Sequence, residues 1–255
     1  MCIDCGCGPT DHHHHHHEPG HAQDHGHDHG HSHDQGRRTL RIEEDILAKN
    51  NRLAGNNRAL FGAKGLFVLN LVSSPGSGKT SILERTLRDL AGNIAFAVLE
   101  GDQQTDQDAA RIAATGVPVH QINTGAGCHL DAHMVGHGVE HFDLDATDIL
   151  MIENVGNLVC PAAFDLGEDH KVAVLSVTEG EDKPIKYPNM FHAADLLLIN
   201  KIDLLPYLDF DLEKCKAYAR QVKPDIQILE VSCKSGEGME KWYAWLAQGA
   251  NRKKT

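Results

Sequence analysis

From Leu66 onward, short apolar runs alternate along the chain with longer amphipathic segments. Apolar runs of this length are typical of strands that are buried on both faces of a sheet. The predicted strands are Leu66–Val72, Ile94–Leu99, Ile149–Ile152, Val172–Val177, Leu196–Ile199 and Ile226–Val231. The predicted helices are Lys79–Leu90, Gln107–Thr115, His129–Phe142, Tyr187–Ala194, Leu212–Lys223 and Met239–Gln248. This alternation predicts an α/β fold with a doubly wound, mainly parallel sheet.

Two different segments precede this pattern. Residues Met1–Gly36 are rich in cysteine and histidine and lack a periodic apolar face, so we expect a disordered metal-binding tail. Thr39–Ala63 has helical periodicity, which we expect to pack one apolar side against the body. That side consists of Leu40, Ile46, Leu47, Leu53, Ala54 and Leu60. The predicted domains are the tail, residues 1–36, and an α/β domain, residues 37–255.

Composition excludes several classes of function. The 255 residues carry a formal net charge of −12, which argues against nucleic acid or an anionic membrane as the main partner. We find no apolar run of about 18 residues and no charged-then-apolar leader, so we expect a cytoplasmic protein. In a reducing compartment the cysteines are better explained as metal ligands than as disulfides.

A phosphate-binding loop is predicted at Ser73–Thr80, SSPGSGKT, between the first strand and a helix. Small residues allow backbone N–H groups to wrap the α- and β-phosphates, and Lys79 would then reach the β- and γ-oxygens as a catalytic group. The Thr80 hydroxyl would ligate Mg²⁺. One departure is Ser73, which stands where the usual pattern has its first glycine. The predicted phosphate contacts are Gly76, Ser77, Gly78, Lys79, Thr80 and Ser81.

A second motif indicates which base is bound. The predicted strand ending at Ile199 runs into Asn200-Lys201-Ile202-Asp203, and the Asp203 carboxylate can accept from N1–H and the 2-amino group of guanine. Adenine offers neither donor. Asn200 would tie this loop to the phosphate loop, and the methylene stem of Lys201 would cover the ring. The final guanine-contacting loop is predicted at Ser232, Cys233 and Lys234, so we expect GTP rather than ATP.

Two acidic strand ends are expected at the same edge of the sheet as the phosphate loop. Asp102 would hold Mg²⁺ or its water shell and take part in catalysis, although it can instead cap the following helix. Glu153 is a second candidate ligand, and the N–H of Gly156 would sense the γ-phosphate. No glutamine follows Gly156 to orient water. We therefore expect slow intrinsic hydrolysis.

The tail contains two kinds of metal ligand. Cys2, Cys5 and Cys7 can converge on one ion, with the α-amino group as a candidate fourth donor. Square-planar Ni²⁺ and tetrahedral Zn²⁺ both remain open. His12–His17 and the alternating histidines up to His33 would form a store of weak sites. The run of six histidines also resembles a purification tag.

A third group of ligands is predicted inside the body. Cys128 and His129 lie downstream of the Asp102 strand end, and Cys160 follows the loop of Gly156. Two thiols and an imidazole leave a tetrahedral Zn²⁺ one ligand short, so this site is either open for transfer or completed across a two-fold axis. The alternative is that both cysteines are small buried hydrophobes.

Seven motifs occur in a fixed order along the chain: CxxCGC at residues 2–7, the histidine tract, Ser73–Thr80, Gly127–Asp131 (GCHLD), Glu153–Pro161 (ENVGNLVCP), Thr178–Pro184 (TEGEDKP) and Asn200–Asp203. Together they closely resemble the HypB family of hydrogenase nickel-incorporation GTPases. The resemblance covers nearly the whole chain.

The resemblance implies a GTP-dependent homodimer of the SIMIBI class. By matching position, Cys2, Cys5 and Cys7 would ligate nickel, and Cys128, His129 and Cys160 would form a second site for zinc or nickel. The family delivers Ni²⁺ to the [NiFe]-hydrogenase large-subunit precursor with the zinc-containing accessory protein HypA. Two alternatives stay open. A urease-type nickel GTPase predicts a Cys-Pro-His string that is replaced here by Cys128-His129, and a storage protein would use mainly the histidine tract.

Overall fold

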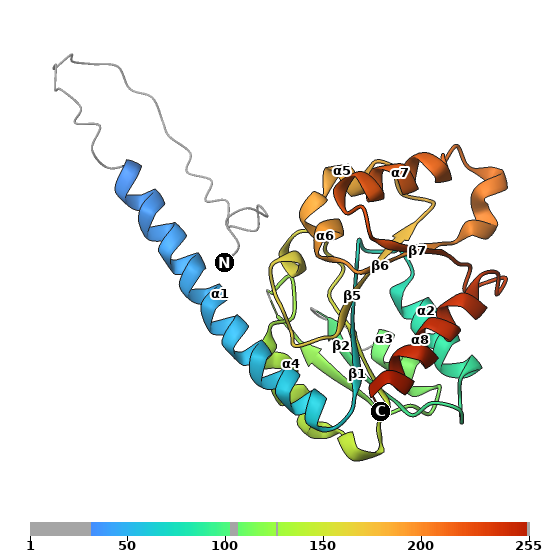
Figure 1. Ribbon diagram of the computed structural model, residues 1–255, viewed down its shortest axis with the longest axis horizontal. Helices are drawn as coiled ribbons and strands as arrows, with labels where there is room; N and C mark the ends of the chain where they lie inside the picture. The colour runs from blue at the N-terminus through green and yellow to red at the C-terminus, as the bar shows by residue number, and fades with distance from the viewer. Residues whose placement is uncertain (1–31, 103–106, 126, 254–255) are drawn as a thin grey trace, which may run out of the picture. The chain divides into compact units, whose positions relative to one another are not determined.

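The computed structural model describes residues 32–102, 107–125 and 127–253, with side chains from residue 44 onward (Figure 1). Its internal contacts divide the chain into two units, Met1–Lys49 and Asn50–Thr255. Helix α1, Ser32–Ala63, contributes residues to both units and begins earlier than the predicted Thr39. None of the helices in the described ranges is long and apolar enough to cross a membrane.

The second unit is built on a parallel sheet. Within the described residues the sheet has seven strands in the order β3-β2-β4-β1-β5-β6-β7, and every neighbouring pair is parallel. The strands are β1 Phe67–Ser73, β2 Phe96–Asp102, β3 Val119–Asn123, β4 Ile149–Glu153, β5 His170–Ser176, β6 Leu196–Asn200 and β7 Gln227–Glu230. The predicted α/β class with a doubly wound parallel sheet is confirmed.

Strand β3 is missing from the predicted set. It lies at the edge of the sheet, pairs only with β2 among the strands described, and its residues are half-buried or exposed. Its sequence, VHQIN, therefore mixes polar and apolar residues. A search for continuous apolar runs finds strands that are covered on both faces and misses an edge strand of this kind.

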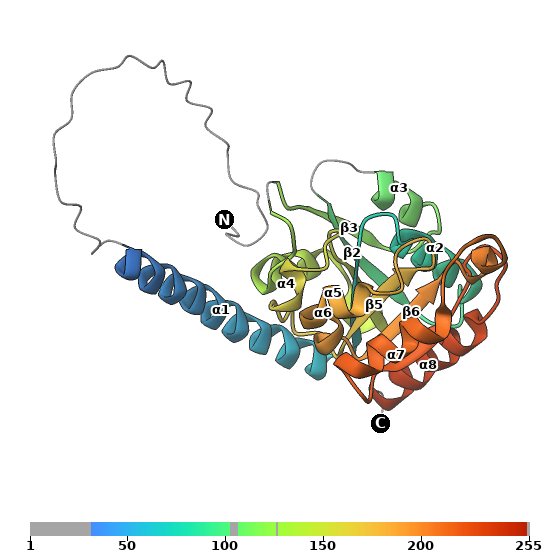
Figure 2. The same cartoon turned by 90° about the horizontal axis from the view of Figure 1, so that it is seen from above.

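Helices cover both faces of the sheet, as Figure 2 shows. One face is covered by α2 Lys79–Asp89, α3 Gln107–Ala113 and α8 Met239–Lys253, which pack on Leu69 and Leu71 of β1. The other face is covered by the end of α1 and by α4 Ala132–Gly138, α6 Pro188–Ala193 and α7 Leu212–Val222. The short helices are α5 Lys183–Lys186 and the 3₁₀ turns Val139–His141, Leu144–Ala146, Cys160–Ala162 and Ile202–Tyr207.

Two predicted helices begin at a different residue in the structure. The helix expected at His129–Phe142 begins only at Ala132, because the Asp131 side chain caps it by accepting from the Met134 N–H at 2.8 Å. His129 is therefore in the preceding loop. The helix expected at Tyr187–Ala194 corresponds to α6, which begins only at Pro188, and the short helix α5 before it was not predicted. Tyr187 separates the two helices, because the ring of Pro188 disfavours helical geometry in the residue before it.

The predicted apolar side of α1 is only partly correct: Ala54 is buried and Leu47 and Leu53 are half-buried, but two other members are exposed. Ile46 and Leu60 are 50% and 39% exposed, whereas the buried positions are Asn50, Ala54, Asn57 and Phe61. Asn57 donates to the carbonyls of Ala132 and Leu166 at 2.8 and 3.0 Å, and these bonds make its burial possible. A search for apolar periodicity passes over the two asparagines, so it finds only part of the buried face.

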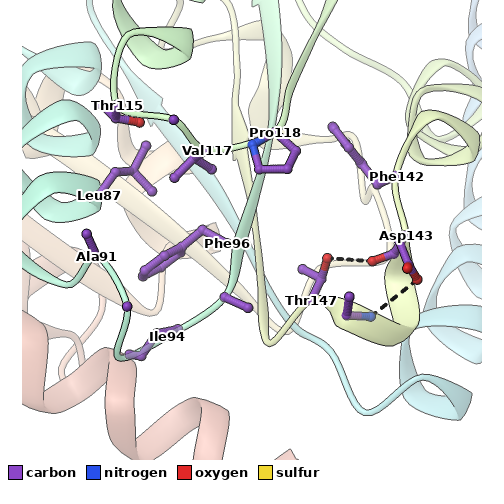
Figure 3. A pocket seen from close by; sticks show the side chains of 14 residues that line it. Leu87, Ala91, Ile94, Phe96, Thr115, Val117, Pro118, Phe142, Asp143 and Thr147 are labelled. Atoms are coloured by element: carbon purple, nitrogen blue, oxygen red, sulfur yellow. Dashed lines mark hydrogen bonds between the residues drawn. The ribbon is translucent and has the colours of Figure 1, made fainter.

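A hollow of about 320 Å³ lies at the amino ends of β2, β3 and β4 (Figure 3). Phe96 begins β2, Pro118 precedes β3 and Thr147 precedes β4, and Leu87 and Ile94 complete its mainly apolar wall. Parallel sheets bind nucleotides at the carboxyl ends of their strands. This hollow is therefore on the opposite edge from the predicted nucleotide site.

Asn57→Ala should lower the free energy of unfolding by about 1–3 kcal/mol, because two buried carbonyls lose their donor. The neighbouring Asn56 is exposed, so Asn56→Ala is the matched control and should change stability little. Urea denaturation of the two variants measures the difference. Equal stabilities would show that the buried amide contributes nothing.

Candidate nucleotide and metal sites

The phosphate loop connects β1 to α2 at the carboxyl edge of the sheet. Gly76 and Gly78 have φ angles of 75° and 97°, a left-handed conformation that favours glycine. A Cβ at Gly78 would lie only 2.6 Å from Nδ2 of Asn200, so glycine is also required by close packing. The loop thus has the strained, open backbone that an anion-binding turn needs.

Lys79 is buried at the start of α2, where its ammonium donates to the Ser73 hydroxyl at 2.7 Å. Burial lowers the pKa of Lys79, and the charge of Glu153 opposes this effect. Ser73 therefore has a role that its place in the motif did not suggest, because it holds the lysine that would contact phosphate.

The predicted base-binding loop lies against the phosphate loop. Asn200 donates to the carbonyl of Ser77 at 3.0 Å, and Lys201 donates to the carbonyl of Gly76 at 2.7 Å. Asp203 accepts from the Ser232 hydroxyl at 2.6 Å, which joins the two loops expected to surround guanine. The structure thus brings these segments together.

Three further residues were predicted for the nucleotide site, namely Ser81, Cys233 and Lys234. The Cys233 carbonyl accepts from Arg85 at 3.2 Å, and burial raises the pKa of its thiol. Lys234 is exposed. The Ser81 hydroxyl accepts from Arg111 at 3.2 Å, so in this conformation it is engaged by α3.

Two buried carboxylates lie side by side at the ends of β2 and β4. Glu100 and Glu153 are register partners, and Glu153 accepts from the Thr80 hydroxyl at 2.8 Å. Burial, reinforced by the charges of Glu153 and Asp102, raises the pKa of Glu100 to about 8. Burial likewise raises the pKa of Glu153 to about 7. Each has one oxygen without a hydrogen-bond partner among the described atoms.

This arrangement fits a hard divalent cation. Unsatisfied carboxylate oxygens beside a threonine hydroxyl are the oxygen donors that Mg²⁺ prefers, and a cation would offset the cost of ionising both acids. Bound there, Mg²⁺ would neutralise phosphate charge. Glu100 was not predicted as a ligand. The sequence feature that could have indicated Glu100 is an acid inside an otherwise apolar strand, two residues before Asp102. Asp102 itself is half-buried at the end of β2.

Gly156 lies against the phosphate loop. A Cβ at Gly156 would be 3.1 Å from Cα of Pro75, a contact tighter than side chains normally make. The predicted γ-phosphate loop and the phosphate loop are therefore in close contact.

Cys128, His129 and Cys160 form one cluster. The Cys128 and Cys160 sulfur atoms are 2.7 Å apart, and Cys128 Sγ is 3.6 Å from Nδ1 of His129. The potential ligand atoms all lie within 4.8 Å of one another. Burial lowers the pKa of His129, which favours the neutral imidazole that binds metals. Two soft sulfurs and one nitrogen fit Ni²⁺ or Zn²⁺.

The remaining predicted ligands, Cys2, Cys5, Cys7 and the histidines up to His31, lie outside the described residues. Within the described part of the chain, Cys128, His129 and Cys160 are the only cluster of three or more such ligands found. The cluster and the carboxylates of Glu100 and Glu153 are separate sites joined by the segment that runs from Glu153 to Cys160.

Comparison with known proteins now identifies the family. Residues 67–230 match the model of the CobW/HypB/UreG nucleotide-binding domain. The hydrogenase maturation factor HypB of Azotobacter vinelandii is 70% identical over 209 residues, covering 82% of this chain and 69% of the relative. The chain belongs to the HypB family. HypB of Escherichia coli K12 is 64% identical over 210 residues, covering 82% of this chain and 72% of the relative.

Solved HypB structures have the same fold. HypB from Archaeoglobus fulgidus matches with a TM-score of 0.75 at 41% identity, covering 80% of this chain and 99% of that chain. HypB from Helicobacter pylori, solved in complex with nickel, matches with a TM-score of 0.77 at 40% identity, covering 80% and 96%. The family identification agrees with the resemblance found in the sequence motifs.

The pKa values of the two buried acids predict how stability depends on pH. Both are raised above the ordinary value of 4.5. Without ligand, the contribution of these two groups to the free energy of unfolding should therefore be largest below about pH 4.5. This contribution should fall as the pH rises through about 7 to 8. Glu100→Gln should flatten this fall by removing one charge.

Chemical denaturation across about pH 5 to 8.5, compared between the parent and Glu100→Gln, measures the effect. Glu84 is a partly exposed acid on α2 that pairs with Arg88 and Arg111, so Glu84→Gln is the control and should keep the parent's slope. A pH slope that is identical in Glu100→Gln would contradict the assignment.

Proposed function

We propose that this chain is a GTP-hydrolysing nickel metallochaperone that delivers Ni²⁺ to the [NiFe]-hydrogenase large-subunit precursor. The observation that carries this proposal is the continuous segment from Glu153 to Cys160. Its first residue accepts from Thr80 of the phosphate loop at 2.8 Å, and its last is a member of the thiol and imidazole cluster. A change at the nucleotide can therefore reach a metal ligand through the backbone.

GTP is proposed from the contacts of Asp203. Its Oδ1 accepts from Ser232, which leaves the other carboxylate oxygen to accept from guanine. Lys79 and the Mg²⁺ proposed at Thr80 and the neighbouring acids would stabilise charge on the transferring phosphoryl group. Slow turnover is proposed because no glutamine follows Gly156 to orient the attacking water.

The second site would hold nickel or zinc. Cys128 and Cys160 as thiolates with neutral His129 supply three donors, so a fourth position is available for transfer or for a ligand from a second copy. Val159, beside Cys160, is 47% exposed, so a second copy of the proposed homodimer would have access to this site. The tail would supply a tight nickel site at its three cysteines and a weaker store at its histidines.

The other partners proposed are HypA and the hydrogenase precursor, with the cytosol as the place of action because thiol ligands remain reduced there. Delivery to urease is a second candidate. A Helicobacter pylori relative that is 40% identical is named as a hydrogenase/urease maturation factor. Loading of the two apoenzymes by the purified chain would distinguish these targets.

Asp203→Asn should weaken GTP binding by roughly 2 kcal/mol, or about thirtyfold, and improve binding of xanthosine triphosphate. Ser232 holds Oδ1, so the new amide NH₂ would face the base and donate to the xanthine 2-carbonyl. Binding of GTP, ATP and xanthosine triphosphate is measured by calorimetry. Asp209→Asn, at an exposed loop position, is the control. Equal binding of ATP and GTP by the parent would sink the GTP assignment.

Cys128→Ala together with Cys160→Ala should leave GTP binding intact and abolish the effect of Ni²⁺ on it. In the parent we expect a coupling of about 1–3 kcal/mol between the two ligands, which is reciprocal by linkage. The affinity for a non-hydrolysable GTP analogue is measured with and without one equivalent of Ni²⁺, and Cys2, Cys5 and Cys7 are replaced by alanine in every protein, the parent included, so that the tail cysteines do not take up the ion. Cys215→Ala, a buried cysteine of α7, is the control. If nickel leaves nucleotide affinity unchanged in the parent, the switch is refuted.

A further inference from the structure

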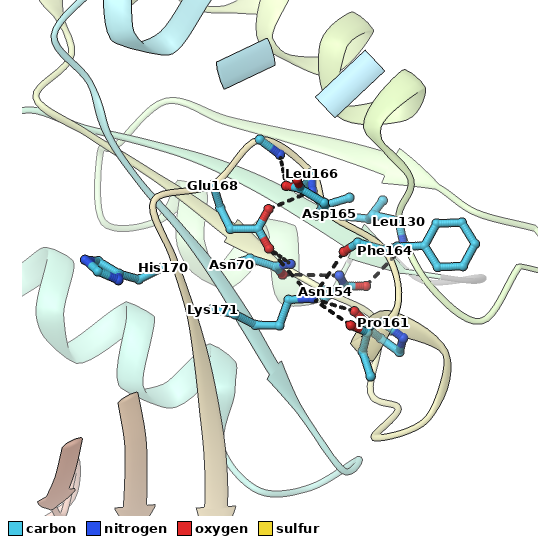
Figure 4. A network of polar contacts seen from close by, with 12 residues as sticks. Asn70, Leu130, Asn154, Pro161, Phe164, Asp165, Leu166, Glu168, His170 and Lys171 are labelled. Atoms are coloured by element: carbon cyan, nitrogen blue, oxygen red, sulfur yellow. Dashed lines mark hydrogen bonds and ion pairs between the residues drawn. The ribbon is translucent and has the colours of Figure 1, made fainter. Parts of the chain in front are cut away.

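A polar residue lies at the centre of the middle strand of the sheet. Asn70 of β1 is fully buried, and its neighbours Val68 and Val72 belong to the two apolar clusters on the face covered by α4 and α6. A buried amide is costly unless it is hydrogen-bonded. Asn70 donates to Glu168 at 3.0 Å and accepts from Asn154 at 3.2 Å (Figure 4). It therefore connects two buried polar groups.

One arm of this network holds the loop of the first two metal ligands. Asn154 follows Glu153, and its side-chain oxygen accepts from the Leu130 N–H at 3.1 Å. Leu130 directly follows His129, and its side chain packs so closely on β2 that a Cβ at Gly101 would lie 2.7 Å from it. The position of the Cys128-His129 loop thus depends on the Asn154 amide.

The other arm holds the segment of the third ligand. Lys171 is 7% exposed, and its ammonium donates to the carbonyls of Pro161, Ala162 and Phe164 at 2.8, 3.4 and 3.2 Å. These carbonyls belong to the turn that Cys160 begins and to the residues directly after it. Figure 4 shows the lysine reaching across to this turn from β5. An ammonium has three donors, so it can satisfy three carbonyls at once.

Glu168 supplies the negative charge that offsets the cost of burying the Lys171 ammonium. Its carboxylate lies 3.8 Å from the Lys171 ammonium and also accepts from the Leu166 N–H at 2.7 Å. Burial lowers the pKa of Lys171, and Glu168 opposes that shift. Phe164, whose carbonyl Lys171 binds, also packs its ring on His129 with centroids 3.9 Å apart. The turn of Cys160 is therefore held against the ring of another ligand.

We propose that Lys171, paired with Glu168, is a positioning residue for the Cys128, His129 and Cys160 metal centre. It fixes the Cys160 turn to β5, while Asn70 and Asn154 fix the Cys128-His129 loop to the neighbouring strand β1. The network sets the separation of the thiols without contributing a ligand. This inference rests on the proposed metal-binding function of the cluster. Partners that orient ligands in this way typically change metal affinity by about 10–100-fold when they are removed.

The test uses the full chain with Cys2, Cys5 and Cys7 replaced by alanine, so that thiolate-to-metal absorption reports the body. Lys171→Met is combined with Glu168→Gln, which removes both charges and leaves no unpaired ion. The single amide oxygen introduced by Glu168→Gln can accept from the Leu166 N–H but cannot also replace the oxygen that accepts from Asn70, so the double variant weakens this arm of the network as well.

The control is Lys216→Met, which removes a largely buried lysine of α7 that is paired with Glu213 and Glu230. It matches the loss of a lysine and of its ion pairs, but the residue lies outside the network that holds the metal ligands. Titrations of parent, double variant and control with Ni²⁺ and Zn²⁺ are followed by absorption.

We expect the double variant to bind both ions about 10–100-fold more weakly, with nucleotide affinity retained, and the Lys216→Met variant to bind as the parent does. If the double variant does not fold, Glu168→Gln alone should give a smaller loss of affinity. Metal affinity equal to the parent's in a folded variant would overturn the proposal and leave Lys171 a purely structural residue.

The outcomes also separate this inference from the proposed function. Absence of any thiolate absorption in the parent would show that the cluster does not bind these ions, and the proposed function would fail first. If the parent binds metal but nucleotide does not alter its affinity, the switch fails, whereas the positioning role is still decided by comparing the variant with the parent.

Discussion

The hydrogen bond from Thr80 to Glu153 is the contact on which the rest of the site depends. It joins the phosphate loop, after β1, to the end of the neighbouring strand β4 at 2.8 Å. Glu153 is buried there and so is Glu100 beside it, and this burial raises the pKa of both carboxyl groups. Binding of a cation and nucleotide would relieve this cost. The ligand-free site therefore carries the electrostatic cost of two buried acids, which bound ligands would offset.

The metal cluster is held in position by two buried polar residues, Asn154 and Lys171. Asn154 follows Glu153 and holds Leu130, and the chain continues to Cys160, whose turn is fixed by Lys171. Ligands from two loops that are distant in sequence are therefore tied to two neighbouring strands, β1 and β5. Because protein interiors are close-packed, a small displacement of this segment must be taken up by rearrangement rather than by compression. This gives the nucleotide and metal sites a physical connection.

Much of the fold could be predicted because strands buried on both faces are continuous apolar runs. Strand β3 was not predicted because an edge strand is only half covered and therefore lacks a continuous apolar run. Part of the buried face of α1 was missed because Asn57 is polar, and its burial is made possible by hydrogen bonds. The ligand cluster was predictable from residue type. Glu100 and Lys171 were not, because their roles depend on desolvation and on partners that only the tertiary structure brings together.

The most direct test of the account is X-ray absorption at the nickel edge. One nickel ion per chain is bound to the full chain with Cys2, Cys5 and Cys7 replaced by alanine, in the GDP state and with a non-hydrolysable GTP analogue. The account predicts sulfur donors from Cys128 and Cys160 and a different coordination shell in the two states. An identical shell in both states would contradict the connection between nucleotide and metal.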